Sequence, residues 1–156
     1  MTTKKLKIGI DYHGVIDQHP EYFALFCKEA ISRGHKIYVI TGGPSKDVAV
    51  KLGEFNNPYN EIFAIVDFYG QSSLMNFSDD GKYKISDELW NKAKGEYCRK
   101  EKIDIHIDDS QEYIKWFTTP YCLYNKKENK CKMPKRGFID FSYLPAKAVD
   151  MIEQII

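Results

Sequence analysis

The sequence predicts an α/β fold, a Rossmann-like three-layer sandwich with a mostly parallel central sheet and a small β-hairpin insertion. Short apolar runs that read as buried strands alternate with segments of helical periodicity, which is typical of a parallel sheet with helices on both faces. The clearest apolar runs are 6–11, 36–41 and 103–109. A chain of 156 residues can bury the core of one layered unit, so we expect a single domain over 1–156.

Two helices are expected after the first two strands. Pro20 in a first turn and Gly34 as a stop delimit a segment with apolar residues at helical spacing. Ser45 is expected to be the N-cap of a second, shorter helix that ends near Gly53.

The middle of the chain is expected to add a third strand at 61–67 and then a hairpin. Residues 74–77 and 83–85 flank Ser-Asp-Asp-Gly at 78–81, and Asp-Gly supplies the positive φ that a tight turn needs. We therefore expect a hairpin insertion at about 72–85, too small to be a further domain.

The C-terminal half is expected to hold two more helices and a further strand. Ser86 is the predicted N-cap of a helix that ends near Lys102. A strand is expected at 121–124, and Pro145 is expected to open a helix that ends at Ile156.

Overall composition gives no reason to expect nucleic acid or an anionic membrane as a partner. The 23 basic and 22 acidic residues nearly cancel. After MTTKKLK, only three apolar residues precede Asp11, which is too short a run for a signal sequence or a membrane-spanning helix. We expect a cytoplasmic protein.

The cysteines suggest neither a disulfide framework nor a zinc ribbon. Cys27, Cys98, Cys122 and Cys131 form no C-x-x-C pair and lie far apart in sequence. We expect mostly free thiols, with a metal site at Cys122 and Cys131 as the alternative.

Polar residues at the ends of three predicted strands are the main functional signal. The carboxyl ends of parallel strands form the ligand crevice of an open α/β sheet, so these residues should converge there. They are Asp11, Thr41, Asp108 and Asp109. Carboxylates brought together repel one another unless a cation lies among them, and an all-oxygen site suits Mg²⁺. Magnesium beside a carboxylate nucleophile indicates phosphoryl transfer.

Such chemistry also needs a cation at the phosphoryl oxygens, and Lys94 is the best candidate. Lys94 lies within the apolar stripe of its helix, four residues after Trp90 and four before Cys98, whereas Lys92 lies off that stripe. A lysine in a buried stripe normally needs an anion. The alternative is that its stem snorkels over the stripe and its ammonium reaches water.

These motifs, in this order, resemble those of the haloacid dehalogenase-like hydrolases, over residues 6 to about 115. The matching segments are IGIDYHGVID, IYVITGG, KGEYC and IHIDDS. The resemblance implies that Asp11 is the nucleophile and a metal ligand, and that Lys94 braces Asp11 and the phosphate. A response-regulator receiver, which uses similar chemistry, would instead need its acidic pair after the first strand.

The resemblance also assigns the remaining site residues. Thr41 and the backbone of Gly42 would hold the phosphoryl group. Asp108, Asp109 and the backbone carbonyl of His13 would complete the Mg²⁺ shell together with Asp11.

His13 is the main departure from the family pattern. Phosphatases of this family usually carry a second aspartate at that position, as the general acid and then the general base. Imidazole can serve both roles, because its unperturbed pKa of about 6.5 is near neutrality. We expect a phosphomonoesterase with His13 as acid/base, and keep as alternatives a slow or altered transferase and a silent binding module.

The substrate is expected to enter an open site. The few residues between Asp11 and Pro20 leave no room for a helical cap, and the hairpin at 72–85 is small. An uncapped site suits a phosphorylated macromolecule, such as a protein or a nucleic-acid end, or a neighbouring subunit could close it. A small nucleotide or sugar phosphate stays open as well.

The basic segment 126–136 carries six Lys or Arg residues in eleven positions, with Tyr121, Tyr124 and Phe138 nearby. A solvated turn is the favoured interpretation, since charge runs usually lie at the surface. The alternative is a phosphate-backbone contact, through which a catalytically weak module would engage a phosphorylated or nucleic-acid partner.

Three further residues have structural roles as their first interpretation. His106 is expected to pack beneath a helix, and His19 is expected at a helix entry. Asp17 is expected either in the loop over the site or as a turn residue.

Overall fold

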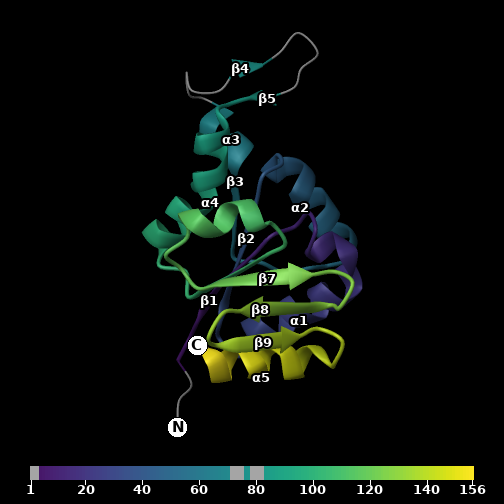
Figure 1. Cartoon of the computed structure of the whole chain (residues 1–156). Coiled ribbons are helices and arrows are strands. Elements are labelled where there is room, and N and C mark those ends of the chain that lie inside the picture. The colour runs from purple at the N-terminus through teal and green to yellow at the C-terminus, as the bar shows by residue number, and fades with distance from the viewer. Residues whose placement is uncertain (1–3, 71–75, 78–82) are drawn as a thin grey trace.

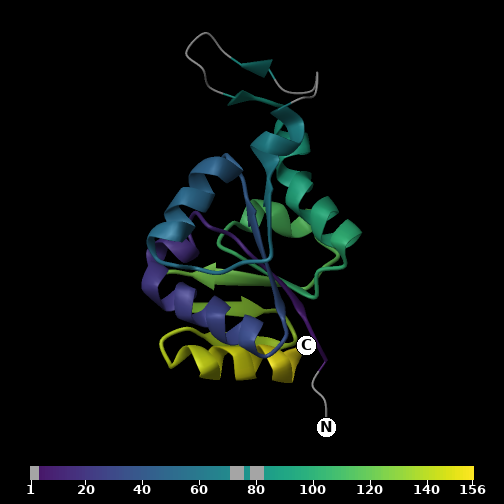
Figure 2. The ribbon, with the colours of Figure 1, turned by 180° about the vertical axis from the view of Figure 1, so that it is seen from behind.

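A seven-stranded sheet with helices on both faces forms the centre of the molecule (Figures 1 and 2). The structure is a computed structural model and describes residues 4–70, 76–77 and 83–156. The sheet consists of β1 (Lys7–Ile10), β2 (Lys36–Thr41), β3 (Glu61–Ala64), β6 (Ile105–Asp108), β7 (Tyr121–Asn125), β8 (Lys130–Met133) and β9 (Gly137–Asp140). Its strand order is β3-β2-β1-β6-β7-β8-β9. The pairings from β3 through β7 are parallel, and β8 and β9 add antiparallel strands. The predicted fold class is confirmed.

The helices make two outer layers. They are α1 (Pro20–Ser32), α2 (Ser45–Glu54), α3 (Ile65–Gly70), α4 (Asp87–Glu101) and α5 (Pro145–Ile155), with short 3₁₀ helices η1 (Ile16–Gln18) and η2 (Gln111–Trp116). One apolar cluster joins α1, α2 and α5 to one face of the sheet, and two smaller clusters join α3 and α4 to the other. Among the described residues, no helix is long and apolar enough to cross a membrane.

The parallel strands are buried on both faces, which explains their continuous apolar sequence. In β2 every residue after Lys36 is buried, and in β6 all four residues are buried. Strands covered by helices on both sides need apolar side chains in both directions. Polar side chains at their carboxyl ends are therefore exceptions that need a partner or a function.

The predicted hairpin insertion is confirmed in its two strands. β4 (Asn76–Phe77) and β5 (Tyr83–Lys84) pair antiparallel. Both views place them beyond α3 and away from the central sheet (Figures 1 and 2). The predicted turn at 78–81 lies outside the described residues.

The predicted strand 61–67 is wrong in its second half. β3 ends at Ala64, and the chain is helical from Ile65 to Gly70. Ile65 and Tyr69 lie one helical turn apart and pack with Ala93 of α4 in one apolar cluster. Burial at helical spacing overrides the short β-like run of Ile65 and Val66.

The prediction that Ser45 is an N-cap is wrong. Pro44 occupies that position with φ −58° and ψ 133°, and Ser45 is the first residue of α2. Proline fixes φ near this value and adopts extended backbone readily, so it ends the loop one residue earlier. The Ser45 hydroxyl instead hydrogen-bonds the Asp67 carboxylate, which ties the start of α2 to α3.

The favoured interpretation of 126–136 as a solvated turn missed a strand. Residues 126–129 and 134–136 do form turns, but β8 lies between them and pairs with both β7 and β9. Cys131 and Met133 point into the core, whereas Lys132 is exposed. This alternation is the period of a half-buried strand, but the abundance of lysine hid it.

The prediction of free thiols is wrong for one pair of cysteines. Cys122 and Cys131 form a disulfide between β7 and β8, with a Cα–Cα distance of 5.3 Å. Antiparallel pairing brings the two residues within the usual range for such a bond, which sequence spacing alone did not reveal. Cys27 and Cys98 are free and buried, as expected.

Candidate metal centre and phosphoryl site

The strand-end residues converge as predicted. Asp11 follows β1 directly, and its backbone N–H donates to the Ile107 carbonyl at 2.9 Å, which extends the pairing with β6. The neighbouring strands β2 and β6 end at Thr41 and Asp108. One carboxylate oxygen from each of Asp11, Asp108 and Asp109 can be chosen so that all three lie within 4.8 Å of one another. The parallel topology therefore places a compact acidic cluster at one edge of the sheet.

Lys94 meets this cluster from α4. Its Nζ atom lies 3.1 Å from Asp11 Oδ1 and 2.8 Å from Asp108 Oδ2. Its side chain is only 2% exposed, so the alternative in which it snorkels to water is wrong. Burial lowers the pKa of Lys94, but Asp11 and Asp108 outweigh that effect and raise it above its ordinary value. Lys94 is therefore a permanent cation in the site.

Asp108 is held on both carboxylate oxygens. Oδ2 lies 2.8 Å from Lys94 Nζ and 2.9 Å from His106 Nε2, and Oδ1 accepts a hydrogen bond from the Ser110 backbone at 3.1 Å. Burial raises the pKa of Asp108, but Lys94 and His106 outweigh burial and bring it below its ordinary value. Asp108 is thus a fixed anion that fastens Lys94 between the two strand ends.

His106 has more than the packing role that the sequence suggested. Its ring is fully buried and stacks on Phe117, with ring centroids 5.1 Å apart. Burial lowers its pKa, which favours a neutral ring that donates from Nε2 to Asp108. His106 therefore positions Asp108 from within the sheet.

Asp11 is the least satisfied carboxylate. Burial raises its pKa well above the ordinary value, Lys94 opposes that rise, and Asp108 and Asp109 add to it. Burial and Asp108 also raise the pKa of Asp109. Three carboxylates around one ammonium leave an excess of negative charge, which a bound cation would neutralise.

The donor set fits Mg²⁺. Asp11 Oδ1 has the ionic contact with Lys94 but accepts no hydrogen bond, and the buried Thr41 Oγ1 has no hydrogen-bond partner among the described residues. Asp109 is exposed and can turn an oxygen toward a ligand. Unsatisfied oxygens on hard anionic groups are what Mg²⁺ selects. Asp11, Asp108 and Asp109 are the residues whose carboxylates would hold the ion.

The loop after β2 forms the opposite side of the site. Thr41 is fully buried, and Gly42 and Gly43 follow it before α2 begins. A Cβ atom on Gly42 would lie 2.7 Å from the indole of Trp90, so only glycine lets Trp90 pack against this loop. Free backbone N–H groups near a helix start are well suited to bind a phosphoryl group.

His13 lies over the glycine loop. Its side chain is 52% exposed, and its Nδ1 atom is 3.6 Å from Asp17 Oδ2. Its Nε2 atom lies 3.4 Å from the place where a Cβ on Gly43 would be. Asp17 Oδ1 accepts a hydrogen bond from the Gly14 backbone at 2.8 Å. Asp17 thus combines the two roles that its sequence left open, because it shapes the turn and faces His13 over the site.

Gly14 allows this loop to approach Asp109. Its φ of +90° lies in the region that favours glycine, and a Cβ atom there would overlap the Asp109 carboxylate. Both conditions require glycine at position 14, between His13 and the carboxylate cluster.

Two aromatic residues of the site were not predicted as functional. The Trp90 indole N–H donates to the Tyr113 hydroxyl at 3.2 Å, and the Tyr113 ring lies 5.0 Å from Lys94 Nζ. Together they form an aromatic wall beside the ammonium. Trp90 was detectable as the residue one turn before Lys94, but Tyr113 lies on η2, whose sequence has no periodic signal.

Comparisons with known proteins give no match: neither a protein-family model, nor a curated protein, nor a solved structure matches this chain. The function is therefore inferred from the geometry of the site and the chemistry of its residues.

Replacing Gly14 by alanine should weaken Mg²⁺ binding while the fold is retained. The new methyl group displaces Asp109, and disturbing a group that orients a metal site typically costs about 10–100-fold in metal affinity. Isothermal titration with Mg²⁺ measures the loss, and circular dichroism checks the fold. Gly53→Ala is the matched control, because nothing lies within 4 Å of a Cβ at that position. Wild-type Mg²⁺ affinity in a folded Gly14→Ala protein would contradict this geometry.

Mg²⁺ affinity should fall as pH is lowered, and the fall should begin above the ordinary titration range of an aspartate near pH 3.9. The reason is that the raised pKa of Asp11 lets a proton compete with the metal at higher pH than usual. Mg²⁺ titrations at a series of pH values measure this dependence, and Asp11→Asn should remove most of it. An affinity that stays constant down to the ordinary aspartate range would contradict the assignment.

Proposed function

We propose that this protein is a Mg²⁺-dependent phosphomonoesterase that works through an aspartyl-phosphate on Asp11. The observation that carries the proposal is the buried ammonium of Lys94, held at 3.1 Å from Asp11 and 2.8 Å from Asp108 beside a third carboxylate. A permanent cation next to a nucleophile in an acidic, oxygen-rich site suits the transfer of an anionic phosphoryl group.

The phosphoryl group is bound by residues from two elements. Lys94 on α4 balances its negative charge, and the Thr41 hydroxyl and the Gly42 backbone N–H at the end of β2 donate hydrogen bonds to its oxygens. A bound Mg²⁺ would supply further neutralisation of those oxygens. The Thr41 hydroxyl has no partner in the described part of the chain, which supports this role, because a buried polar group without a partner is costly unless a ligand satisfies it.

In the first step, a carboxylate oxygen of Asp11 attacks phosphorus, and the bond from phosphorus to the ester oxygen breaks. The leaving oxygen takes a proton from His13. In the second step, His13 removes a proton from water as the water oxygen attacks phosphorus. The bond between phosphorus and Asp11 then breaks, which releases inorganic phosphate and restores the carboxylate.

Asp17 supports the acid/base role of His13. The carboxylate faces Nδ1 of the imidazole at 3.6 Å, so Nε2 is the nitrogen directed to the glycine loop. A carboxylate beside one ring nitrogen orients the imidazole for proton transfer at the other. The resemblance of the ordered motifs to haloacid dehalogenase-like hydrolases supports the same assignment of Asp11, Thr41 and Lys94.

A second candidate is a catalytically weak binding module that keeps the metal site. The exposure of His13 favours it, since more than half of this side chain is in contact with solvent and its contact with Asp17 is long. Such a module would use the basic segment 126–136 to engage a phosphorylated or nucleic-acid partner. Turnover measurements separate the two candidates.

Asp11→Asn should abolish hydrolysis of an aryl phosphate in the presence of Mg²⁺, because the amide cannot act as the nucleophile. His13→Ala should lower kcat about 100-fold or more, which is the usual contribution of a general acid or base. Asp17→Asn, whose side-chain oxygen can still accept from Gly14, should lower kcat less. Steady-state kinetics over a panel of phosphate esters, with and without EDTA, provide the measurement.

The control is Lys28→Ala, an exposed change on α1. Wild-type rates no higher than those of Asp11→Asn across the panel would favour the binding module. Full turnover by His13→Ala would remove the histidine from the mechanism and leave the nucleophile assignment standing.

A further inference from the structure

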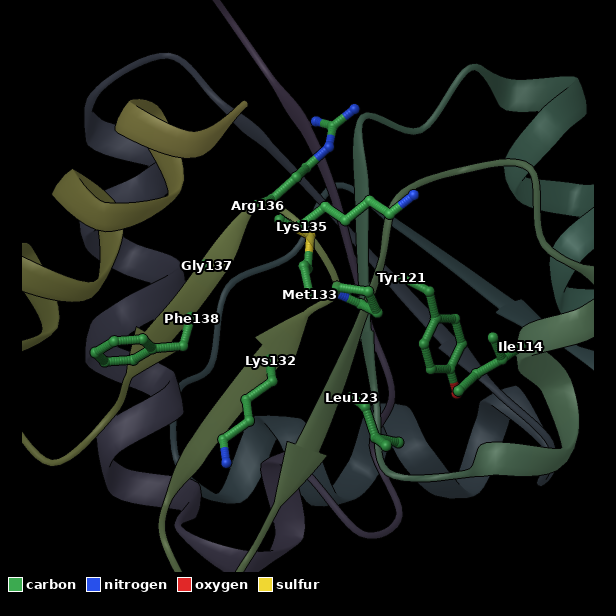
Figure 3. Close-up of a pocket in the computed structure, with 10 residues that line it drawn as sticks. Ile114, Tyr121, Leu123, Lys132, Met133, Lys135, Arg136, Gly137 and Phe138 are labelled. Atoms are coloured by element: carbon green, nitrogen blue, oxygen red, sulfur yellow. The ribbon is translucent and has the colours of Figure 1, made fainter.

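The outward face of β7, β8 and β9 is left uncovered by the helical layer that contains α4. Leu123, Lys132 and Phe138 are direct cross-strand partners and form a row across this face. Figure 3 shows these side chains projecting from the sheet, with Lys135 and Arg136 at one end and Tyr121 and Ile114 to the side. Phe138 is 50% exposed.

This face is basic in a chain whose total charge is nearly balanced. The cations that line its two hollows are Lys126, Lys127, Lys132, Lys135 and Arg136. Apart from Asp109, the acidic residues that line them are Glu112 and Glu128. Lys132 pairs with Glu128 at 3.6 Å in an exposed contact, where such a pair contributes little. The five cations exceed the three acidic residues by two, so the face keeps a net positive charge that can attract an anion.

The basic face is continuous with the candidate metal centre. One hollow of about 580 Å³ is lined by Phe138, Leu123 and Lys132 among others. A second of about 690 Å³ is lined by Leu123, Lys132 and Asp109. Because the two hollows share Leu123 and Lys132, one continuous surface leads across the sheet to Asp109, one of the carboxylates that would hold Mg²⁺.

We propose that this face binds single-stranded nucleic acid and presents its terminal phosphate to Asp11. The inference rests on the proposed function for its chemistry, and it adds the substrate class. Successive phosphates would lie against the lysines and Arg136, and unpaired bases would lie on Leu123 and Phe138. Grooves that combine cations with exposed aromatic side chains are typical of proteins that bind single strands without strong sequence preference.

The apolar side chains of this face, Leu123 and Phe138, form its floor, and this floor favours a nucleic-acid strand over an acidic phosphopeptide. An apolar floor with a half-exposed aromatic ring matches the flat faces of bases, whereas the side chains of an acidic peptide would gain nothing from it. The Lys130 ammonium lies 5.4 Å from the Phe138 ring centroid, so cation and aromatic ring are already combined at one point. A duplex would hide its bases from this floor.

Binding is tested by fluorescence anisotropy with a single strand of about 10 nucleotides, a length within the usual range for such surfaces. The strand carries the fluorophore at one end and a 5′ or 3′ phosphate at the other. The double variant Lys132→Glu/Arg136→Glu should bind at least about tenfold more weakly, and the slope of log affinity against log salt should become shallower by about 1 to 2. The matched control is Lys28→Glu/Lys100→Glu, which changes the net charge equally at exposed positions on α1 and α4.

Phe138→Ala tests the floor separately. It should weaken single-strand binding about fivefold or more, as expected for the loss of one stacking partner, and leave the salt slope unchanged. Equal losses in the double variant and its control would overturn the proposal. So would equally tight binding of a duplex, or equal competition by an acidic phosphopeptide of the same charge.

Hydrolysis measurements test whether the basic face delivers the terminal phosphate to Asp11. Wild type should release phosphate from the oligonucleotide with a kcat/KM at least about tenfold above that for a mononucleotide, as expected if binding to remote phosphates contributes. The double variant should lose this advantage and keep the mononucleotide rate. Equal kcat/KM values in wild type would overturn delivery to Asp11. Specific binding without hydrolysis of any phosphate would instead overturn the proposed function and support the surface.

Discussion

The contact of Lys94 with Asp11 and Asp108 is the interaction on which the rest of the site depends. Two strand-end carboxylates that are both more than nine-tenths buried would repel each other strongly without the ammonium between them. The Lys94 ammonium reduces this repulsion, but it balances only part of the negative charge once Asp109 is included. The fold therefore contains a site that is short of positive charge, which supports the proposal that Mg²⁺ and a phosphoryl group bind there together.

The surrounding structure keeps that arrangement rigid. His106 within the sheet and the Ser110 backbone hold Asp108, so the position of Lys94 does not depend on ligand. Gly14 permits close approach of the His13 loop to Asp109, and Asp17 orients that loop. The proposed catalytic groups thus come from separate elements, and the packing of those elements fixes the distances between them.

The sequence was sufficient to predict the parts of the site that lie at the ends of buried strands. Asp11, Thr41 and Asp108 interrupt apolar runs, and parallel topology then requires their convergence. Contacts made by tertiary packing could not be predicted, such as the buried link from His106 to Asp108 or the wall formed with Tyr113. The antiparallel strands β8 and β9 could not be predicted, because their outward residues are lysines and other residues common at the surface. Such residues are also typical of a turn. For the same reason the disulfide of β7 and β8 was not foreseen.

The most direct test of the central claim is to trap the covalent intermediate. His13→Ala protein, mixed with an aryl phosphate and Mg²⁺ and quenched in acid, should carry a phosphoryl group that peptide mass spectrometry maps to Asp11. The intermediate should accumulate because the variant keeps the nucleophile, Lys94 and the proposed metal ligands but lacks the base that activates water. Phosphate release by this variant without any adduct on Asp11, or an adduct that persists in Asp11→Asn, would contradict it.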